Sequence, residues 1–193
     1  MFLDPEHPRH QGRRARFPTA LALLLTLCAL AAACGDQTEQ ANKLVAEMNN
    51  LVVRGEGMAR QGTAKQEELE AKDIEKERDA VRAGAREQAT LFKQAADAFR
   101  EAAAKADEAA KLRLADWYKN YLSLKAQQHR KTAELLDAAL ERAELLAGDQ
   151  PLEELDAKLS QSAERVARLS KEEEELVKQV KRVEEEHKAD FTP

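Results

Sequence analysis

The most regular hydrophobic pattern in the chain lies between residues 152 and 187. Mostly apolar residues follow one another there at unbroken spacings of three and four, namely Leu152, Leu155, Leu159, Ser162, Val166, Leu169, Glu173, Leu176, Val180, Val183 and His187. Residues with this spacing share one seam of an α-helix, and the seven-residue period predicts left-handed supercoiling against partner helices. Glu173 interrupts the apolar seam. We expect it to set the register or to pair with a Lys or Arg of another helix, at some cost in stability.

A short turn is predicted immediately before this helix, at residues 148–151. Gly148 stands where many helices end in a left-handed residue, and Asp149 or Gln150 follows as an N-cap, with Pro151 in the first turn of the next helix. Helices joined by so short a turn are antiparallel neighbours.

The segment 86–147 carries apolar stripes along its whole length and predicts one long helix. The stripe begins with Phe92, Ala95, Phe99, Ala102, Ala106 and Ala109, continues with Leu114, Trp117, Tyr118, Tyr121, Leu122 and Leu124, and ends with Leu135, Leu136, Ala139, Leu140, Ala143 and Leu146. Its alanine-rich half permits close packing against a neighbour, whereas its aromatic half needs more room.

The first helix of the bundle is predicted to begin at Asp36 and to continue to about residue 80. Its seam is formed by Ala41, Leu44, Met48, Leu51, Gly55, Met58 and Gly62. The two glycines either allow a neighbouring helix to approach closely or weaken the helix. We place the reversal after it at Arg82–Ala85, around Gly84, and a true turn at Gly62 is the alternative.

These segments predict an all-α fold, an elongated antiparallel bundle of three long helices with coiled-coil packing, or of four helices if Gly62 is a turn. The composition agrees, because 35% of the residues are charged and Pro151 is the only proline between Gly35 and Thr192. No alternating run of β-branched residues predicts a strand.

The first 33 residues have the three-part pattern of a secretory signal. A polar start ends in Arg13, Arg14 and Arg16, an uncharged leucine-rich run follows from Phe17, and small residues close it at Ala31–Ala33. The apolar run is shorter than the roughly 20 residues that a membrane-spanning helix needs. An uncleaved amino-terminal anchor is the alternative interpretation.

The residues Leu30-Ala31-Ala32-Ala33-Cys34 resemble the lipobox of bacterial lipoproteins. The resemblance implies that residues 1–33 are removed and that Cys34 is acylated, so that a helical domain of residues 34–193 is held at the membrane by acyl chains. Gly35 follows the cysteine where the acidic inner-membrane retention signal would stand. The expected location is therefore the outer membrane, facing the periplasm, and inner-membrane retention is the alternative. The segment 41–45 (ANKLV) is also similar to the first mature helix of uncharacterised envelope lipoproteins.

Charge and cysteine content argue against several classes of function. Removing residues 1–33 takes four Arg and two acidic residues from totals of 31 basic and 36 acidic residues, which leaves a net charge of −7. An acidic domain argues against nucleic-acid binding and against adhesion to anionic headgroups. With Cys28 removed and Cys34 acylated, no thiol remains for a disulfide, redox or thiolate metal site.

Trp117, Tyr118 and Tyr121 form the candidate partner-binding surface, and the alternative interpretation is that they belong to the bundle core. His187 has no second histidine one turn away, so no metal or cofactor is expected. No catalytic motif is evident.

The expected function is a non-enzymatic spacer, scaffold or assembly partner that binds a protein or a second copy through its helix faces. A binding module that presents Trp117–Leu124 to a partner helix or lipid is the alternative.

Overall fold

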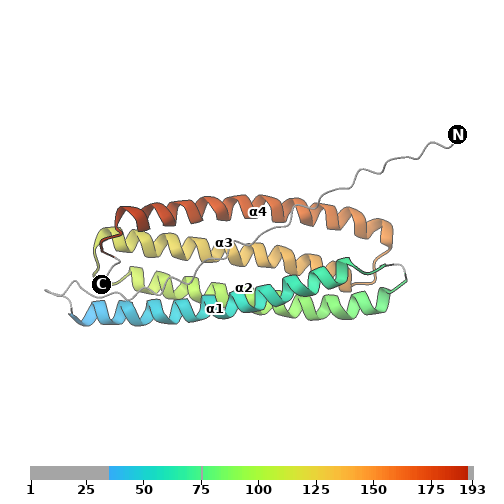
Figure 1. The fold of residues 1–193 in the computed structure, drawn as a ribbon, viewed down its shortest axis with the longest axis horizontal. Helices are drawn as coiled ribbons and strands as arrows, with labels where there is room; N and C mark the ends of the chain where they lie inside the picture. Colours follow the sequence, from blue (N-terminus) through green and yellow to red (C-terminus); the bar gives the residue numbers. More distant parts are fainter. Residues whose placement is uncertain (1–34, 75, 191–193) are drawn as a thin grey trace.

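The computed structural model describes residues 35–74 and 76–190, and this part of the chain is helical without a strand. Helix α1 spans Gly35–Glu70, α2 spans Arg78–Ala110, α3 spans Asp116–Ala147 and α4 spans Leu152–Glu186. Successive helices run antiparallel, and together they form a long, narrow bundle (Figure 1). At 1.5 Å per residue, each helix is about 50 Å long. The predicted all-α bundle is confirmed.

The predicted position of the first turn is wrong, and a further turn was not predicted. The first reversal lies at residues 71–77, and both Gly62 and Gly84 lie inside helices. The segment 86–147 forms two helices, because the chain turns at residues 111–115. That turn contains no glycine or proline. Its Leu112 and Leu114 instead pack against the apolar cluster at this end of the bundle, so tertiary packing ends α2 there.

The glycines of α1 are positions of close helix contact. A Cβ atom at Gly62 would lie 2.6 Å from Cε1 of Phe92, and one at Gly55 would lie 3.0 Å from Cε2 of Phe99. Both rings belong to α2 and are buried. The prediction that these glycines allow a neighbouring helix to approach closely is therefore confirmed.

The core is made mainly by α1, α2 and α3, and much of it consists of small side chains. The buried positions of α2 are Val81, Ala85, Gln88, Phe92, Ala95, Ala96, Ala98, Phe99, Ala102, Ala103, Ala106 and Ala109. Within the described residues, close backbone packing joins each helix to the next one along the chain, whereas α1 and α4 make at most marginal backbone contact. Helix α4 is therefore supported chiefly by α3.

The turn between α3 and α4 lies at the predicted residues but has a different structure. Gly148 has φ −80° and ψ 178°, which is extended backbone and not the left-handed conformation we predicted. Neither Asp149 nor Gln150 is the predicted N-cap of α4. Asp149 pairs with Arg82 of α2, and the Gln150 side chain donates to the carbonyl of Leu145. Pro151 occupies the N-cap position without a side-chain cap.

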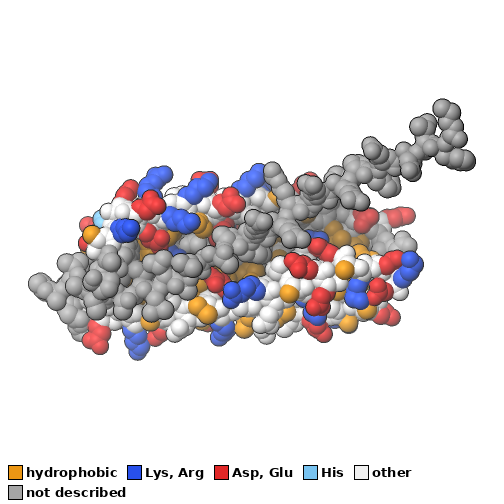
Figure 2. Space-filling view, viewed as in Figure 1, with side chains coloured by type: hydrophobic (Ala, Val, Ile, Leu, Met, Phe, Trp, Pro, Cys, Tyr) orange, Lys and Arg blue, Asp and Glu red, His pale blue; other side chains and the backbone are white. Residues whose placement is uncertain are grey.

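The outer faces of the bundle are polar. Figure 2 shows acidic and basic side chains interspersed over the visible face, and Val53, at 55% exposure, is the large apolar side chain that stands out as exposed in the part of the chain described here. None of the helices described is both long enough and apolar enough to span a membrane.

The glycine contacts lead to a paired prediction on α1. We expect Gly62→Ala to lower the free energy of unfolding by about 1–2 kcal/mol, because the new methyl group collides with the buried Phe92 ring. Gly57→Ala is the matched control, since no atom lies within 4 Å of its Cβ position. The control should gain up to about 1 kcal/mol from helix propensity. Urea unfolding followed by circular dichroism measures both, and equal effects at the two sites would contradict close packing at Gly62.

Candidate functional site

Cys34 lies outside the described residues, but the described part of the chain begins at the next residue. Helix α1 begins at the next residue, Gly35, so an acyl group on Cys34 would be attached directly to the start of this helix. The backbone N–H of Arg113, in the turn between α2 and α3, donates to Oε1 of Gln37 at 2.6 Å. The start of α1 and that turn therefore share one end of the bundle.

The aromatic residues of the candidate partner surface lie at the same end, at the start of α3. Tyr118 and Tyr121 are buried in the largest apolar cluster, and burial raises the pKa of Tyr118 to about 12. The hydroxyl of Tyr121 donates to Oε1 of Glu184 at 3.0 Å, and burial together with this carboxylate raises the pKa of Tyr121. In the closed bundle, both tyrosines are therefore core residues that α4 helps to cover.

Trp117 is more accessible than the two tyrosines. Its ring is half-buried and stacks on the imidazole of His187, with the ring centroids 4.3 Å apart and the planes 9° from parallel. Nδ1 of His187 in turn lies 3.1 Å from Oδ2 of Asp190. The contact joins the beginning of α3 to the end of α4, so Trp117 reports directly on whether these two helices are docked.

A second group of polar side chains crosses the middle of the bundle. We call it the polar belt, and it consists of Glu56 of α1, Lys125 and His129 of α3, and Glu173 of α4. Lys125 is central to it. Burial lowers the pKa of Lys125, and the carboxylates of Glu184, Glu56 and Glu173 act in the opposite direction. Its Nζ donates to Oε1 of Gln128 at 3.2 Å.

Glu173 is the seam residue that the sequence singled out. Thr132 of α3 donates to its Oε1 at 3.4 Å, and the charge of Lys125 also favours the ionised carboxylate. Burial is nevertheless the largest effect and raises the pKa of Glu173. Glu173 therefore contacts α3 through a hydrogen bond with Thr132 rather than through the predicted ion pair, although the charge of Lys125 acts on it. It carries the predicted cost, because its charge is partly removed from water.

His129 was missed by the sequence analysis and is the most buried member of the belt, with 3% of its surface exposed. Neither of its ring nitrogens has a hydrogen-bond partner among the residues described. Burial lowers the pKa of His129 to about 3, and the like charge of Lys125 adds to the effect. The sequence did contain a signal for the burial of His129, which is its place on one helix face. The residues of this face are spaced by three and four, namely Leu122, Lys125, His129, Thr132 and Leu136.

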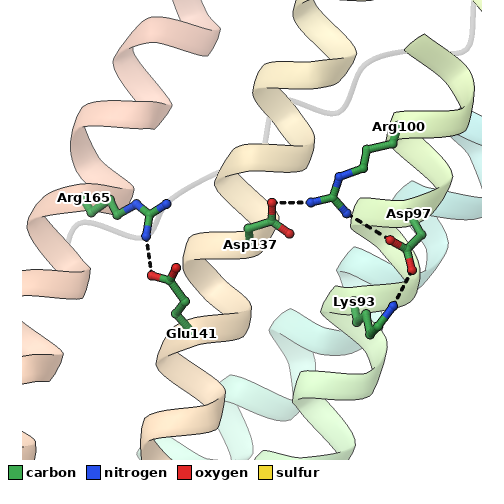
Figure 3. Close-up of polar contacts among 6 residues, drawn as sticks. All are labelled: Lys93, Asp97, Arg100, Asp137, Glu141 and Arg165. Carbon is green, nitrogen blue, oxygen red and sulfur yellow. Dashed lines mark hydrogen bonds and ion pairs between the residues drawn. The ribbon is translucent and has the colours of Figure 1, made fainter. Parts of the chain in front are cut away.

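The face of α3 between α2 and α4 carries ion pairs that join all three helices (Figure 3). Asp137 of α3 pairs with Arg100 of α2, which also contacts Asp97, and Glu141 of α3 pairs with Arg165 of α4. These side chains are largely exposed, so each pair contributes little to stability. The pairs that join different helices instead help to fix how far neighbouring helices are shifted along their axes.

Comparison with protein-family models, with curated proteins and with solved structures finds no match to this chain. In the described part of the chain, no three His, Cys, Asp or Glu side chains are grouped so as to hold a metal ion. Functional inference therefore depends on the bundle geometry, the aromatic end and the polar belt.

The partly buried charge of Glu173 leads to a prediction at this position. We expect Glu173→Leu to raise the free energy of unfolding by about 1 kcal/mol at neutral pH, because leucine continues the apolar seam and removes a desolvated charge. Because the pKa of Glu173 is raised, the folded protein binds this proton more readily than the unfolded chain does. The penalty from Glu173, and with it the gain from leucine, should therefore shrink as pH falls.

Glu174→Leu, at the neighbouring exposed position, is the control and should give no such gain. Urea unfolding at several pH values measures both variants. A loss of stability in Glu173→Leu at neutral pH would mean that the interactions of Glu173 with Lys125 and Thr132 outweigh its desolvation.

Proposed function

We propose that this protein is a lipid-anchored, non-enzymatic component of the bacterial envelope that acts as a spacer, scaffold or assembly partner through its helix faces. The observation that carries the proposal is the position of Cys34. The residue that completes the lipobox-like sequence stands directly before α1, so an acyl anchor there would be attached to one end of an elongated bundle.

The geometry supports a spacer. In the proposed arrangement, the start of α1, the turn at 111–115 and the end of α4 are nearest the membrane, and the turns at 71–77 and 148–151 are farthest from it (Figure 1). Helices of this length carry the far turns about 50 Å from the anchored end. The location we propose is the outer membrane, with the bundle in the periplasm.

The helix faces support contact with other proteins or with a second copy. The outer surface carries charges of both signs, and α4 follows the three-and-four spacing of coiled-coil seams. Coiled-coil packing between α4 and α3 is part of this proposal. Surfaces of this kind select partners by matching charges along a helix more than by burying apolar patches.

The anchor is tested by a pair of cysteine substitutions in the full chain expressed in a Gram-negative host. We expect Cys34→Ser to abolish incorporation of labelled palmitate, because the hydroxyl cannot form the thioether that carries the lipid. Cys28→Ser should retain the label. Mass spectrometry of the amino-terminal peptide should show an acylated residue 34 in the wild-type protein. If Cys34→Ser loses residues 1–33 and the product still sediments with membranes, the anchor proposal is wrong.

A second function is favoured by the one-sided support of α4. Because α4 packs chiefly on α3, its release would leave the contacts among α1, α2 and α3 in place. Release would also separate Trp117 from His187 and Tyr121 from Glu184. The surface Trp117–Leu124 would then be available to a partner helix or to lipid, as in a binding module.

A cross-link between α3 and α4 tests this second function. The Ser162 hydroxyl lies 3.4 Å from the carbonyl oxygen of Ala138, so cysteines at these two positions are candidates for a disulfide that fixes α4 on α3. For a binding module, we expect envelope extract to change the acrylamide quenching of Trp117 in the reduced protein and to have no effect on the oxidised one. An extract without effect on either form would favour the permanently closed scaffold.

A further inference from the structure

The polar belt interrupts the apolar core at mid-length. One apolar cluster includes Leu122 and Ala126 of α3, and the next begins on this helix at Ala133. His129 lies between them, and its ring is 5.9 Å from the ring of Phe99. A titratable ring therefore occupies the position where the two clusters would otherwise meet.

Each helix of the bundle presents a defined group to this region. Helix α1 contributes Glu56, on which the charge of Arg60 also acts, and α2 contributes the uncharged ring of Phe99. Helix α3 contributes Lys125, one turn from His129. Helix α4 contributes Glu173, with Glu174 beside it, and Glu184. The carboxylates of this region therefore balance the charges of Lys125 and Arg60.

A proton on His129 has no stabilising partner in the closed bundle. The charge that acts on the imidazole is that of Lys125, which has the same sign. Both ring nitrogens are buried without an acceptor among the described side chains and backbone groups. A charged imidazolium in such a site is strongly disfavoured, so the proton can be taken up readily only when the helices around it separate.

We propose that the middle of the bundle is an acid-sensitive opening point, at which protonation of His129 holds α3 apart from α1 and α2 once these helices have separated. The device is built from the side-chain arrangement at mid-length and is independent of the lipid anchor.

The sign of the effect follows from proton linkage. Burial lowers the pKa of His129 to about 3 in the folded protein, against 6.5 for an accessible histidine. The stability that a neutral His129 allows is therefore complete above pH 6.5 and is lost as pH falls toward 3. Burial raises the pKa of Glu56 and of Glu173, so these two groups favour the folded protein as pH falls. Only a comparison that keeps both carboxyl groups isolates the histidine.

The test compares the full chain with His129→Leu in a mild non-ionic detergent, by urea unfolding at pH 7.5 and at pH 4.5. We expect the unfolding equilibrium constant of the wild-type protein to rise about 100-fold more than that of His129→Leu between these two values. His187→Gln is the matched control, because His187 lies at the rim of the bundle and is partly exposed. It should keep the pH dependence of the wild-type protein.

Two further measurements on the wild-type protein keep the proposal testable if His129→Leu fails to fold. The NMR resonance of the His129 ring should remain that of a neutral imidazole at pH 5, and a titration near 6.5 in the folded protein would overturn the proposal. Hydrogen exchange at pH 5, corrected for intrinsic rates, should accelerate around residues 125–133 before it does around Leu69 and Val81. Equal acceleration at both places, or equal pH dependence in wild type and His129→Leu, would also refute it.

Discussion

The close approach of α1 and α2 is the contact on which the rest of the bundle depends. Gly55 and Gly62 let the α1 backbone lie against the rings of Phe99 and Phe92, and alanines fill most of the remaining α2 interface. Small side chains bury little apolar area each, so stability comes from dense contact along the full length of the helices. The thin core also explains why the molecule is long, because a short bundle of such helices would bury too little surface to fold.

Helix α4 is held in a different way. It has no extensive contact with α1, and its apolar seam toward α3 is interrupted by Ser162 and Glu173, which make polar contacts with Ala138 and Thr132. Each of these contacts fixes an axial position at the expense of apolar burial. The bundle thus combines extensive packing of α2 against α1 and α3 with a fourth helix that packs less extensively, on α3. The two functions proposed above, scaffold and binding module, differ in whether the fourth helix is released from α3.

The sequence predicted those features that depend on local pattern. The α4 seam and the turn before it were found because the three-and-four spacing is unbroken and a glycine and a proline mark the turn. The turns at 71–77 and 111–115 were missed, since neither contains such a residue and the second is set by the packing of Leu112 and Leu114. Gly84 was taken for the first turn and Gly62 for its alternative, although both glycines lie inside helices, where a side chain of another helix packs closely against them. Glu173 was recognised because it breaks an apolar seam. His129 was missed because its burial depends on other helices, such as α2 with the Phe99 ring, and cannot be read from one helix.

An even number of helices has a geometric consequence for the whole molecule. With three helices the last one would end at the tip opposite to where the first begins, but the fourth brings the chain back, so that α4 ends at the same end of the bundle at which α1 starts (Figure 1). Among the described residues, the opposite tip is therefore made of the two hairpin bends at 71–77 and 148–151. These bends are fastened to each other by Arg78, which donates to the carbonyl of Gln150 at 2.6 Å, and by Arg82, which donates to that of Gly148 at 3.1 Å. In the part of the chain that the structure describes, these two hydrogen bonds brace the two bends into a closed cap.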